Sequence, residues 1–332
     1  MRKFVIMIFS FFVLISCSQK SEHREKIEIS LVANIGIETV RTPEDEAYLF
    51  YNIRSVDCDS MGNIYVLDNK GVFVKVFDRQ GRFLRRILSE GRWPEEIENP
   101  YSIKINRAND HLFVLNLHGY EIKEFTPTGR YVNQYYLPQQ IMFFFDFLDM
   151  ERIIFVDIKS QYRFKILNLK TRRIEKSFIP LPTVPSVVYG NQRFVLKDGI
   201  LWTCHNDETK LMGYDFKTQK KIAEIKIPEI YKKYTIEKTP TWWAARLRQF
   251  AQPILLNDKL YVLFTRWEWT SDKPAELKKF NVSLYRLEGN QVKKIKEIPE
   301  AKFMYLGTTW QNRLILYGND PYPHVKVFEI KD

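Results

Sequence analysis

The sequence predicts an all-β protein, a six-bladed β-propeller with four antiparallel strands in each blade. Three observations predict this fold: four-strand units recur along the chain, tight Gly-containing turns separate the strands, and apolar and polar residues alternate between the turns. The chain has 332 residues, of which 45% are hydrophobic and 15% aromatic. This composition allows a large core and excludes a disordered, collagen-like or disulfide-scaffold chain.

The first residues predict export and a lipid anchor. A cationic start, Met1-Arg2-Lys3, precedes an apolar run over residues 4–14 that is too short to span a bilayer as a helix, as expected of a signal peptide. Leu14-Ile15-Ser16-Cys17 resembles the lipobox of bacterial lipoproteins, and the resemblance implies cleavage before Cys17 and diacylglycerol on its thiol. The alternative is an ordinary secretory signal, although residues 14–16 lack the small residue that such a site needs two positions before the cut. We therefore expect a signal peptide over residues 1–16, a tether over 17–26 and one propeller domain over 27–332.

Two repeats align almost without gaps. The first covers residues 53–68 and 74–84, and the second covers 102–116 and 121–132. Each is predicted to form four strands, which we name A to D. Residues 59–63 and 106–110 join A to B, and residues 78–81 and 126–129 join C to D, with turn-forming Asp, Asn, Thr and Gly at the expected positions.

Degenerate copies of the repeat follow. The last copy has three strands, so the alternating segment 27–33 is expected to pair with residues 325–328 and close the ring, because an open propeller edge would aggregate. A seven-bladed ring that counts residues 26–50 as a blade is disfavoured, since that segment lacks a second hairpin. The expected strands are 143–148, 153–156, 164–167 and 174–178 in blade 3; 193–196, 200–203, 211–216 and 221–225 in blade 4; 253–256, 260–264, 282–286 and 292–298 in blade 5; and 303–307, 314–317 and 325–328 in blade 6.

The repeat and one connector resemble a known family. The pattern apolar-Tyr-Val-Leu-Asp followed by apolar-Lys-Val-Phe-Asp-x-x-Gly resembles the NHL-type repeat, and residues 91–100 resemble the Gly-rich connector of TolB-like six-bladed β-propeller lipoproteins. Trp93 and Glu95 stand where that connector prefers Gly, and Ile97 where it prefers an aromatic residue. The resemblance implies the fold and the location in the cell, but it does not imply any particular reaction.

The topology predicts which loops lie together. Strands alternate in direction, so the B–C and D–A connections share one face, the connector face, and the A–B and C–D turns share the other, the turn face. Long connections on the connector face are the expected binding region. The D–A connection over residues 228–252 contains a predicted short helix, and the B–C connections of blades 5 and 6 are predicted to be loops. Exposed aromatic and Arg side chains there suit a protein or glycan partner, although the Trp residues could instead form a lid packed on the blades. The candidate ligand-binding residues are Arg54, Trp242, Trp243, Arg246, Arg266, Trp267, Trp269 and Tyr322.

Polar residues near the ends of the B strands are Asp68, Asn116, Asp157 and His205. They are expected either to bond the backbone of the next turn or to form a polar ring around the axis. Cys58 and Cys204 are predicted to be buried free thiols, because the repeats place them three blades apart. No metal or nucleophile motif is present, so we expect no catalytic residue, metal or cofactor.

The predicted function is that of a lipid-anchored extracytoplasmic binding or scaffold protein for a protein or glycan. The alternative is a metal-dependent hydrolase, lyase or lactonase with its site at the axial channel mouth, where a site built from His118, His205 and His324 is geometrically conceivable. Residues Lys and Arg outnumber Asp and Glu by 51 − 40 = 11, which suits anionic surroundings. Nucleic acid is not expected as a partner of an exported lipoprotein. Ser18 follows Cys17 at the position where Asp would favour retention in the inner membrane, so the outer membrane is the expected location. The sequence leaves open which side of that membrane the protein faces.

Overall fold

The computed structural model describes residues 27–141, 144–157, 162–180, 193–205, 210–228, 247–269, 277–302 and 304–331. Only the backbone is described at Pro180, His205 and residues 247–250, 266–269 and 277–280. The expected signal peptide, tether and Cys17 lie outside the described residues, as do Trp242, Trp243 and Arg246. Within the described part of the chain, none of the helices is long and apolar enough to cross a bilayer.

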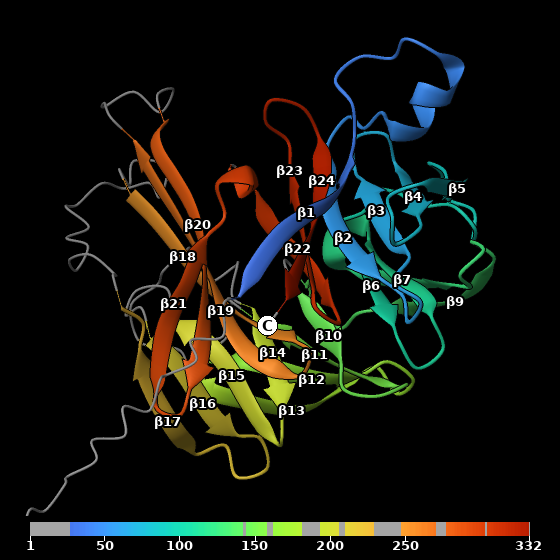
Figure 1. Ribbon diagram of the computed structural model, residues 1–332. Coiled ribbons are helices and arrows are strands. Elements are labelled where there is room, and N and C mark those ends of the chain that lie inside the picture. The colour runs from blue at the N-terminus through green and yellow to red at the C-terminus, as the bar shows by residue number, and fades with distance from the viewer. Residues whose placement is uncertain are drawn as a thin grey trace, which may run out of the picture.

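Six four-stranded antiparallel sheets form the ring (Figure 1), which confirms the predicted six-bladed propeller. The strands are β2 (Ile53–Cys58), β3 (Ile64–Asp68), β4 (Phe73–Phe77) and β5 (Phe83–Ile87) in blade 1; β6 (Ser102–Asn106), β7 (His111–Asn116), β8 (Glu121–Phe125) and β9 (Tyr131–Tyr136) in blade 2; β10 (Phe145–Phe147), β11 (Arg152–Val156), β12 (Tyr162–Asn168) and β13 (Arg173–Pro180) in blade 3; β14 (Phe194–Lys197), β15 (Ile200–His205), β16 (Lys210–Asp215) and β17 (Lys221–Lys226) in blade 4; β18 (Leu247–Leu256), β19 (Lys259–Trp269), β20 (Leu277–Glu288) and β21 (Gln291–Glu297) in blade 5; and β22 (Tyr305–Trp310), β23 (Arg313–Gly318), β24 (His324–Lys331) and β1 (Glu28–Ile35) in blade 6. Short 3₁₀ helices include η1 (Pro43–Tyr48), η2 (Leu117–Gly119) and η5 (Pro299–Ala301).

The N-terminal strand closes the ring, as predicted. β1 pairs antiparallel with β24 from Glu28 opposite Lys331 to Ile35 opposite Val325, and the first and last strands lie side by side in Figure 1. One irregularity falls between Leu31 and Ala33. The backbone groups of β24 that would form an open edge are therefore paired.

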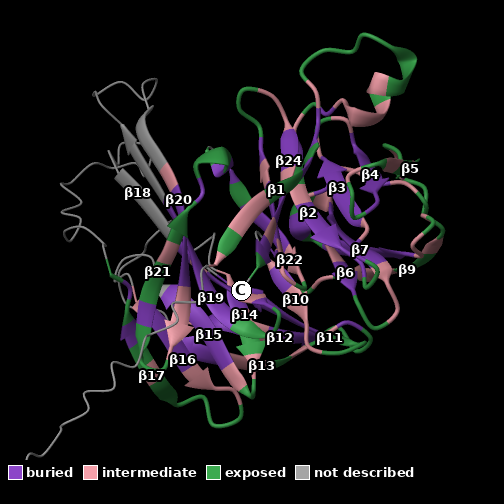
Figure 2. Ribbon diagram, in the orientation of Figure 1, coloured by how far each residue is buried: buried purple, intermediate pink, exposed green. Residues whose placement is uncertain are grey.

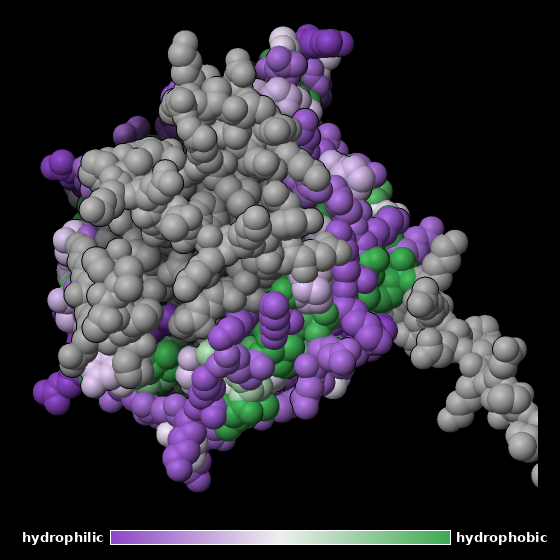
Figure 3. Space-filling model, turned by 90° about the vertical axis from the view of Figure 1, so that its left-hand side faces the viewer, coloured by the Kyte–Doolittle hydropathy of each residue, from purple (hydrophilic) through white to green (hydrophobic). Residues whose placement is uncertain are grey.

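The core lies between the blades rather than at one centre. Figure 2 shows buried residues concentrated along the strands and exposed residues in the turns. Six clusters of buried apolar side chains each join two neighbouring blades, and the cluster between blades 6 and 1 contains Ile35, Ile53, Phe77 and Val327. On the side of the molecule shown in Figure 3, the described side chains are mainly hydrophilic, with hydrophobic residues in small separate patches. Each blade is therefore stabilised chiefly by its neighbours.

The predicted turn chemistry is present. Gly62 and Gly81 both have φ of +82°, a conformation that glycine adopts without strain. Asp59 Oδ1 accepts hydrogen bonds from the backbone N–H groups of Met61 (3.0 Å) and Asn63 (2.8 Å). Cys58 and Cys204 are buried and free, as predicted.

Blade 5 differs from the prediction. Its strands β18, β19 and β20 have 10, 11 and 12 residues, so residues 247–250 form a strand where we expected the end of a helix. Arg266, Trp267 and Trp269 lie on β19 instead of in a B–C loop, and Trp267 pairs with Arg248 and Phe280 in the ladder. The helix formers Ala, Leu, Arg and Gln favoured a helix locally, but strand pairing overrode that propensity.

A lysine on strand C holds the preceding D–A connector in four blades. Lys75 Nζ donates to the backbone carbonyls of Glu46 (2.6 Å) and Leu49 (2.7 Å). The remaining three lysines make equivalent contacts: Lys123 with the carbonyls of Trp93 (2.9 Å) and Glu96 (2.7 Å), Lys326 with the carbonyl of Glu300 (2.6 Å), and Lys165 with the Gln139 Oε1 atom (2.9 Å). The lysine of the apolar-Lys-Val-Phe repeat therefore anchors the connector face to the blades.

Replacing one of these lysines should destabilise the fold. Lys123 is 4% exposed, so Lys123→Met would leave the Trp93 and Glu96 carbonyls without a charged donor. We expect a loss of about 2–4 kcal/mol in the free energy of unfolding, measured in urea, because hydrogen bonds from charged groups contribute about 1.5–3 kcal/mol each. Lys170→Met is the control, since Lys170 is 77% exposed in a surface ion pair with Glu151. Equal stability of the two variants would contradict this role.

Candidate functional site

The axis of the propeller is crossed by charged side chains from the A strands of different blades. Lys104 on β6 lies 3.5 Å from the Asp57 carboxylate of β2 and 3.1 Å from that of Asp146 on β10. Asp57 Oδ2 also accepts the backbone N–H of Ile105 (2.8 Å). These contacts join the inner strands of blades 1, 2 and 3.

Arginines extend this network across the ring. Arg107 donates to the Thr309 carbonyl (2.7 Å) and thus joins blade 2 to blade 6. Arg193, directly before β14, donates to the Leu306 carbonyl (2.8 Å) and joins blade 4 to blade 6. Its guanidinium lies 4.3 Å from the ring centre of Phe144, which Lys104 approaches to 5.5 Å.

The electrostatics of the network favour anions. Burial raises the pKa of Asp57, but the charges of Lys104 and Arg107 outweigh it and leave this pKa below its usual value, so the carboxylate is ionised at neutral pH. The axial groups described are four cations (Arg54, Lys104, Arg107 and Arg193) and two carboxylates (Asp57 and Asp146), a net charge of 4 − 2 = +2.

Arg54 lies at the start of β2, on the connector face of the axis. Its guanidinium lies 4.5 Å from the ring centre of Tyr101, a cation–π contact. Both Arg54 and Arg193 act electrostatically on the hydroxyl of Tyr317, whose pKa burial raises. Among the described residues, neither arginine forms an ion pair.

A cavity of about 130 Å³ opens beside Arg54. Its lining also includes Asn69, Asn99, Pro100, Tyr101 and His118, all from connections of blades 1 and 2 on the connector face. Five non-glycine residues in these connections have positive φ angles: Val72 (51°), Leu88 (63°), Asn99 (50°), Leu117 (47°) and His118 (55°). Such strained conformations cluster at functional sites in other proteins.

Exposed aromatic rings occur in the same connections. Tyr51 is 56% exposed, Trp93 72% and Tyr120 51%. Tyr51 precedes β2, Trp93 lies in the D–A connection between blades 1 and 2, and Tyr120 lies in the B–C connection of blade 2. Together with the cavity, these residues make the connector face of blades 1 and 2 the candidate site, which we call the mouth site.

At the ends of the B strands, Asp68 and Asn116 accept hydrogen bonds from backbone N–H groups. Asp68 Oδ1 accepts the N–H groups of Lys70 (3.0 Å) and Gly71 (2.7 Å), and Asn116 Oδ1 accepts that of Glu98 (2.8 Å). Asp157 instead pairs with Lys165 at 2.6 Å. The polar groups on the axis come from the A strands.

Of the candidate residues whose side chains the structure describes, Arg54 lines the mouth cavity and Tyr322 does not. Tyr322 lies beside His324, with ring centres 5.2 Å apart, in the B–C connection of blade 6. For Arg266, Trp267 and Trp269 only the strand positions are described. Sequence reasoning missed Tyr101 and Arg193, although Arg193 stands at the start of an A strand as Arg54 does.

No group of three His, Cys, Asp or Glu side chains that could hold a metal ion is present in the described part of the chain. His118 lines the mouth cavity, while buried His324 is hydrogen-bonded through Nδ1 to the Tyr322 carbonyl at 2.7 Å. The side chain of His205 lies outside the description.

The fold is that of a six-bladed β-propeller, and charged side chains with a net positive charge gather around its axis. In agreement, residues 41–199 match the model of the DUF5128 family, described as a 6-bladed beta-propeller. A search of curated proteins gave no match.

Two solved structures from Bacteroides are similar in fold. A putative exported protein from Bacteroides fragilis has a TM-score of 0.61 and 10% identity, covering 92% of this chain and 96% of its own. A member of the DUF4221 family from Bacteroides vulgatus has a TM-score of 0.63 and 11% identity, covering 92% of this chain and 99% of its own. At these identities the similarity shows the fold alone.

Proposed function

We propose that the protein is a lipid-anchored, extracytoplasmic binding protein whose mouth site binds an acidic glycan. The observation that carries the proposal is Arg54, which lies on the Tyr101 ring in a cavity at the channel mouth without an ion pair among the described residues. The lipobox-like residues 14–17 support the anchor at Cys17, and a protein of the same fold is described as a putative exported protein.

The residue types of the mouth site suit an acidic sugar. An arginine binds a carboxylate with two parallel hydrogen bonds, the amides of Asn69 and Asn99 can bond hydroxyl groups, and aromatic rings pack against the apolar face of a sugar. A cavity of about 130 Å³ holds part of a ligand, so the exposed rings of Tyr51, Trp93 and Tyr120 would contact neighbouring units of a chain. The second arginine, Arg193, adds positive potential behind Arg54.

The test uses an array of acidic oligosaccharides, with trigalacturonate and its neutral methyl ester as defined probes. We expect Arg54→Gln and Tyr101→Ala to weaken trigalacturonate binding at least about tenfold, and the ester to bind weakly to all variants. Arg79→Gln is the matched control, because it removes one positive charge from the C–D turn on the turn face.

Three results would reject the mouth site. These are equal binding by wild type and Arg54→Gln, equal binding of the acid and its ester, and binding that only Trp242→Ala or Trp267→Ala removes. If no glycan on the array bound and the protein instead captured a protein partner, a scaffold function would be favoured over glycan binding.

A further inference from the structure

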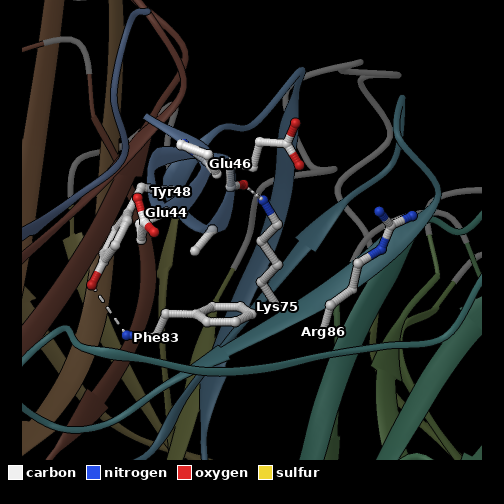
Figure 4. A pocket seen from close by; sticks show the side chains of 8 residues that line it. Glu44, Glu46, Tyr48, Lys75, Phe83 and Arg86 are labelled. Carbon is white, nitrogen blue, oxygen red and sulfur yellow. Dashed lines mark hydrogen bonds between the residues drawn. The ribbon is translucent and has the colours of Figure 1, made fainter. Parts of the chain in front are cut away.

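A second, larger cavity lies on blade 1, away from the axis. It has a volume of about 550 Å³ and lies between η1 and the strands β4 and β5 (Figure 4). This volume is within the range of about 300–1,000 Å³ that is usual for small-molecule sites. The lining residues are Pro43, Glu44, Glu46, Ala47, Tyr48, Lys75, Phe83 and Arg86.

Two cations stand side by side on the sheet wall of this cavity. Lys75 on β4 stands directly opposite Arg86 on β5 in the sheet register. Both approach the same ring, with the Arg86 guanidinium 4.4 Å and Lys75 Nζ 5.0 Å from the centre of Phe73. Burial, and then the charge of Arg86, lower the pKa of Lys75 to about 8. The described residues supply no ion-pair partner for either cation.

The other blades show that the second cation is not needed for the fold. Lys123, Lys165 and Lys326 hold their connectors as Lys75 does, but they stand opposite the neutral residues Gln134, Ser177 and Asn34. Like charges directly opposite each other destabilise a sheet. Arg86 therefore departs from the repeat. Its charge opposite Lys75 destabilises the sheet, and the contact between the strand-C lysine and its connector forms in the other blades without such an arginine.

The η1 side of the lining is mixed: Pro43, Ala47 and the ring of Tyr48 are apolar, whereas Glu44 and Glu46 are acidic. Tyr48 contributes its ring, which lies 5.7 Å from that of Phe77, and its hydroxyl oxygen accepts the backbone N–H of Phe83 (3.2 Å). Figure 4 shows Lys75 pointing toward η1, with the Phe83 ring beside the base of its side chain, Tyr48 on one side of Lys75 and Arg86 on the other. Glu46 contributes its carbonyl to Lys75, and its carboxylate makes no ion pair with the two cations.

We propose that this cavity binds a small organic carboxylate with an apolar body, its carboxylate held by Arg86 and Lys75 and its body against Tyr48 and Phe83. The Arg86 guanidinium can bond both oxygens of a carboxylate. Lys75 adds its charge and the one N–H that the Glu46 and Leu49 carbonyls do not accept, and a bound anion relieves the repulsion between the two cations. The site is separate from the mouth site and does not depend on the proposed glycan binding.

The experiment is calorimetric titration of the protein with 3-phenylpropionate and with the neutral isostere 3-phenylpropanamide. N-acetylphenylalanine is the third probe, because it presents the same carboxylate next to a peptide bond, as a peptide C-terminus does. We expect 3-phenylpropionate to bind and the amide not to bind. Tighter binding of N-acetylphenylalanine than of 3-phenylpropionate would identify a peptide terminus as the source of the carboxylate.

Arg86→Gln is the informative variant. It recreates the Lys–Gln pair already present in blade 2, so the variant should fold, as a thermal unfolding curve would verify. We expect its affinity for 3-phenylpropionate to fall at least about tenfold. Arg82→Gln is the control, since Arg82 lies in the same hairpin but pairs with Asp78 outside the cavity lining.

Three outcomes would overturn the proposal. They are wild-type affinity in Arg86→Gln, equal binding of the amide and the acid, and no heat of binding to wild type at about 10 mM acid, a concentration that reveals millimolar affinities. A loss of binding in Arg82→Gln equal to that in Arg86→Gln would also overturn it, because the effect would then follow from net charge alone.

Discussion

A chain that starts after Ile35 is expected to lose its cooperative unfolding transition and to aggregate. Removing β1 unpairs seven residues of β24 and takes Ile35, which is fully buried, out of the cluster between blades 6 and 1. Burying one Ile contributes about 1.5–3 kcal/mol, and the lost ladder and inter-blade packing add to this. The sum approaches the whole stability of a typical protein, about 5–15 kcal/mol.

β1 also holds blade 1. The Gly81 turn of that blade lies so close to β1 that a Cβ at Gly81 would stand 3.0 Å from the Ala33 Cβ and 3.1 Å from Ile35 Cγ1. Loss of β1 should therefore loosen two blades at once. Size-exclusion chromatography and urea unfolding followed by circular dichroism provide the measurement. The control is a chain that starts at residue 27. A monomeric truncated protein with the control's unfolding midpoint would show that closure does not need β1.

The second large effect is expected at the axis. Asp57→Ala should reduce the free energy of unfolding by about 2–4 kcal/mol at pH 7, because the buried network loses one of the two carboxylates around Lys104 and a buried backbone N–H loses its acceptor. Asp57 is 1% exposed, and its removal would leave Lys104 with Asp146 and would leave the Ile105 N–H without its acceptor. The control is Asp149→Ala, since Asp149 is 39% exposed in its pair with Arg152. It should lose no more than about 1 kcal/mol.

The pH dependence of this effect has a definite sign. The pKa of Asp57 is lower in the folded protein than its usual 3.8, so its stabilising effect is complete above that value. The stabilising effect is lost as the pH falls below 3.8 and through the folded-state pKa. Urea unfolding of wild type and Asp57→Ala at neutral and at acidic pH should therefore give a difference that shrinks in acid. A difference that grows in acid would show that Asp57 is not held ionised by Lys104 and Arg107.

The two proposed sites use the same connector face differently. The mouth site is built from the connections of blades 1 and 2 around Arg54, whereas the second cavity is built where η1, part of the first D–A connection, lies against β4 and β5. In both, a cation without an ion pair among the described residues lies on an aromatic ring, Arg54 on Tyr101 and Arg86 on Phe73. This similarity makes anionic ligands the common expectation for the charged connector face.

The sequence predicted the architecture well because the signals for it are local. Alternation of period two and Gly or Asp at turn positions identified all six blades, and the missing fourth strand of blade 6 predicted the pairing of β1. Blade 5 was the exception, where the residues up to Phe250 have helical propensity in isolation but extend β18 next to β19. Strand pairing over ten residues, a tertiary effect, decided that segment.

Prediction of the site was less complete. Arg54, a candidate binding residue from the sequence, lies beside Tyr101 and lines the mouth cavity, and the buried free thiols were expected from the blade positions of Cys58 and Cys204. Tyr322 lies beside His324 in the B–C connection of blade 6, where it was expected, whereas the Trp residues of blade 5 lie on a strand or outside the described residues. An aromatic side chain in a connection is exposed only if no other part of the protein packs on it. The residue types in the connection do not reveal whether such packing occurs.

By itself the sequence determined the number of blades, the turns, the closing strand and the position of Arg54, because each depends on a pattern within a few tens of residues or on the repeat count. Only the tertiary structure decided that Arg54, Arg193 and Tyr317 gather at one end of the axis, that Lys75 stands opposite Arg86, and that blade 5 extends its strands. The physical reason is that these arrangements join residues on different strands or blades. Their meeting depends on register and on the closure of the ring, and both are set by packing between blades.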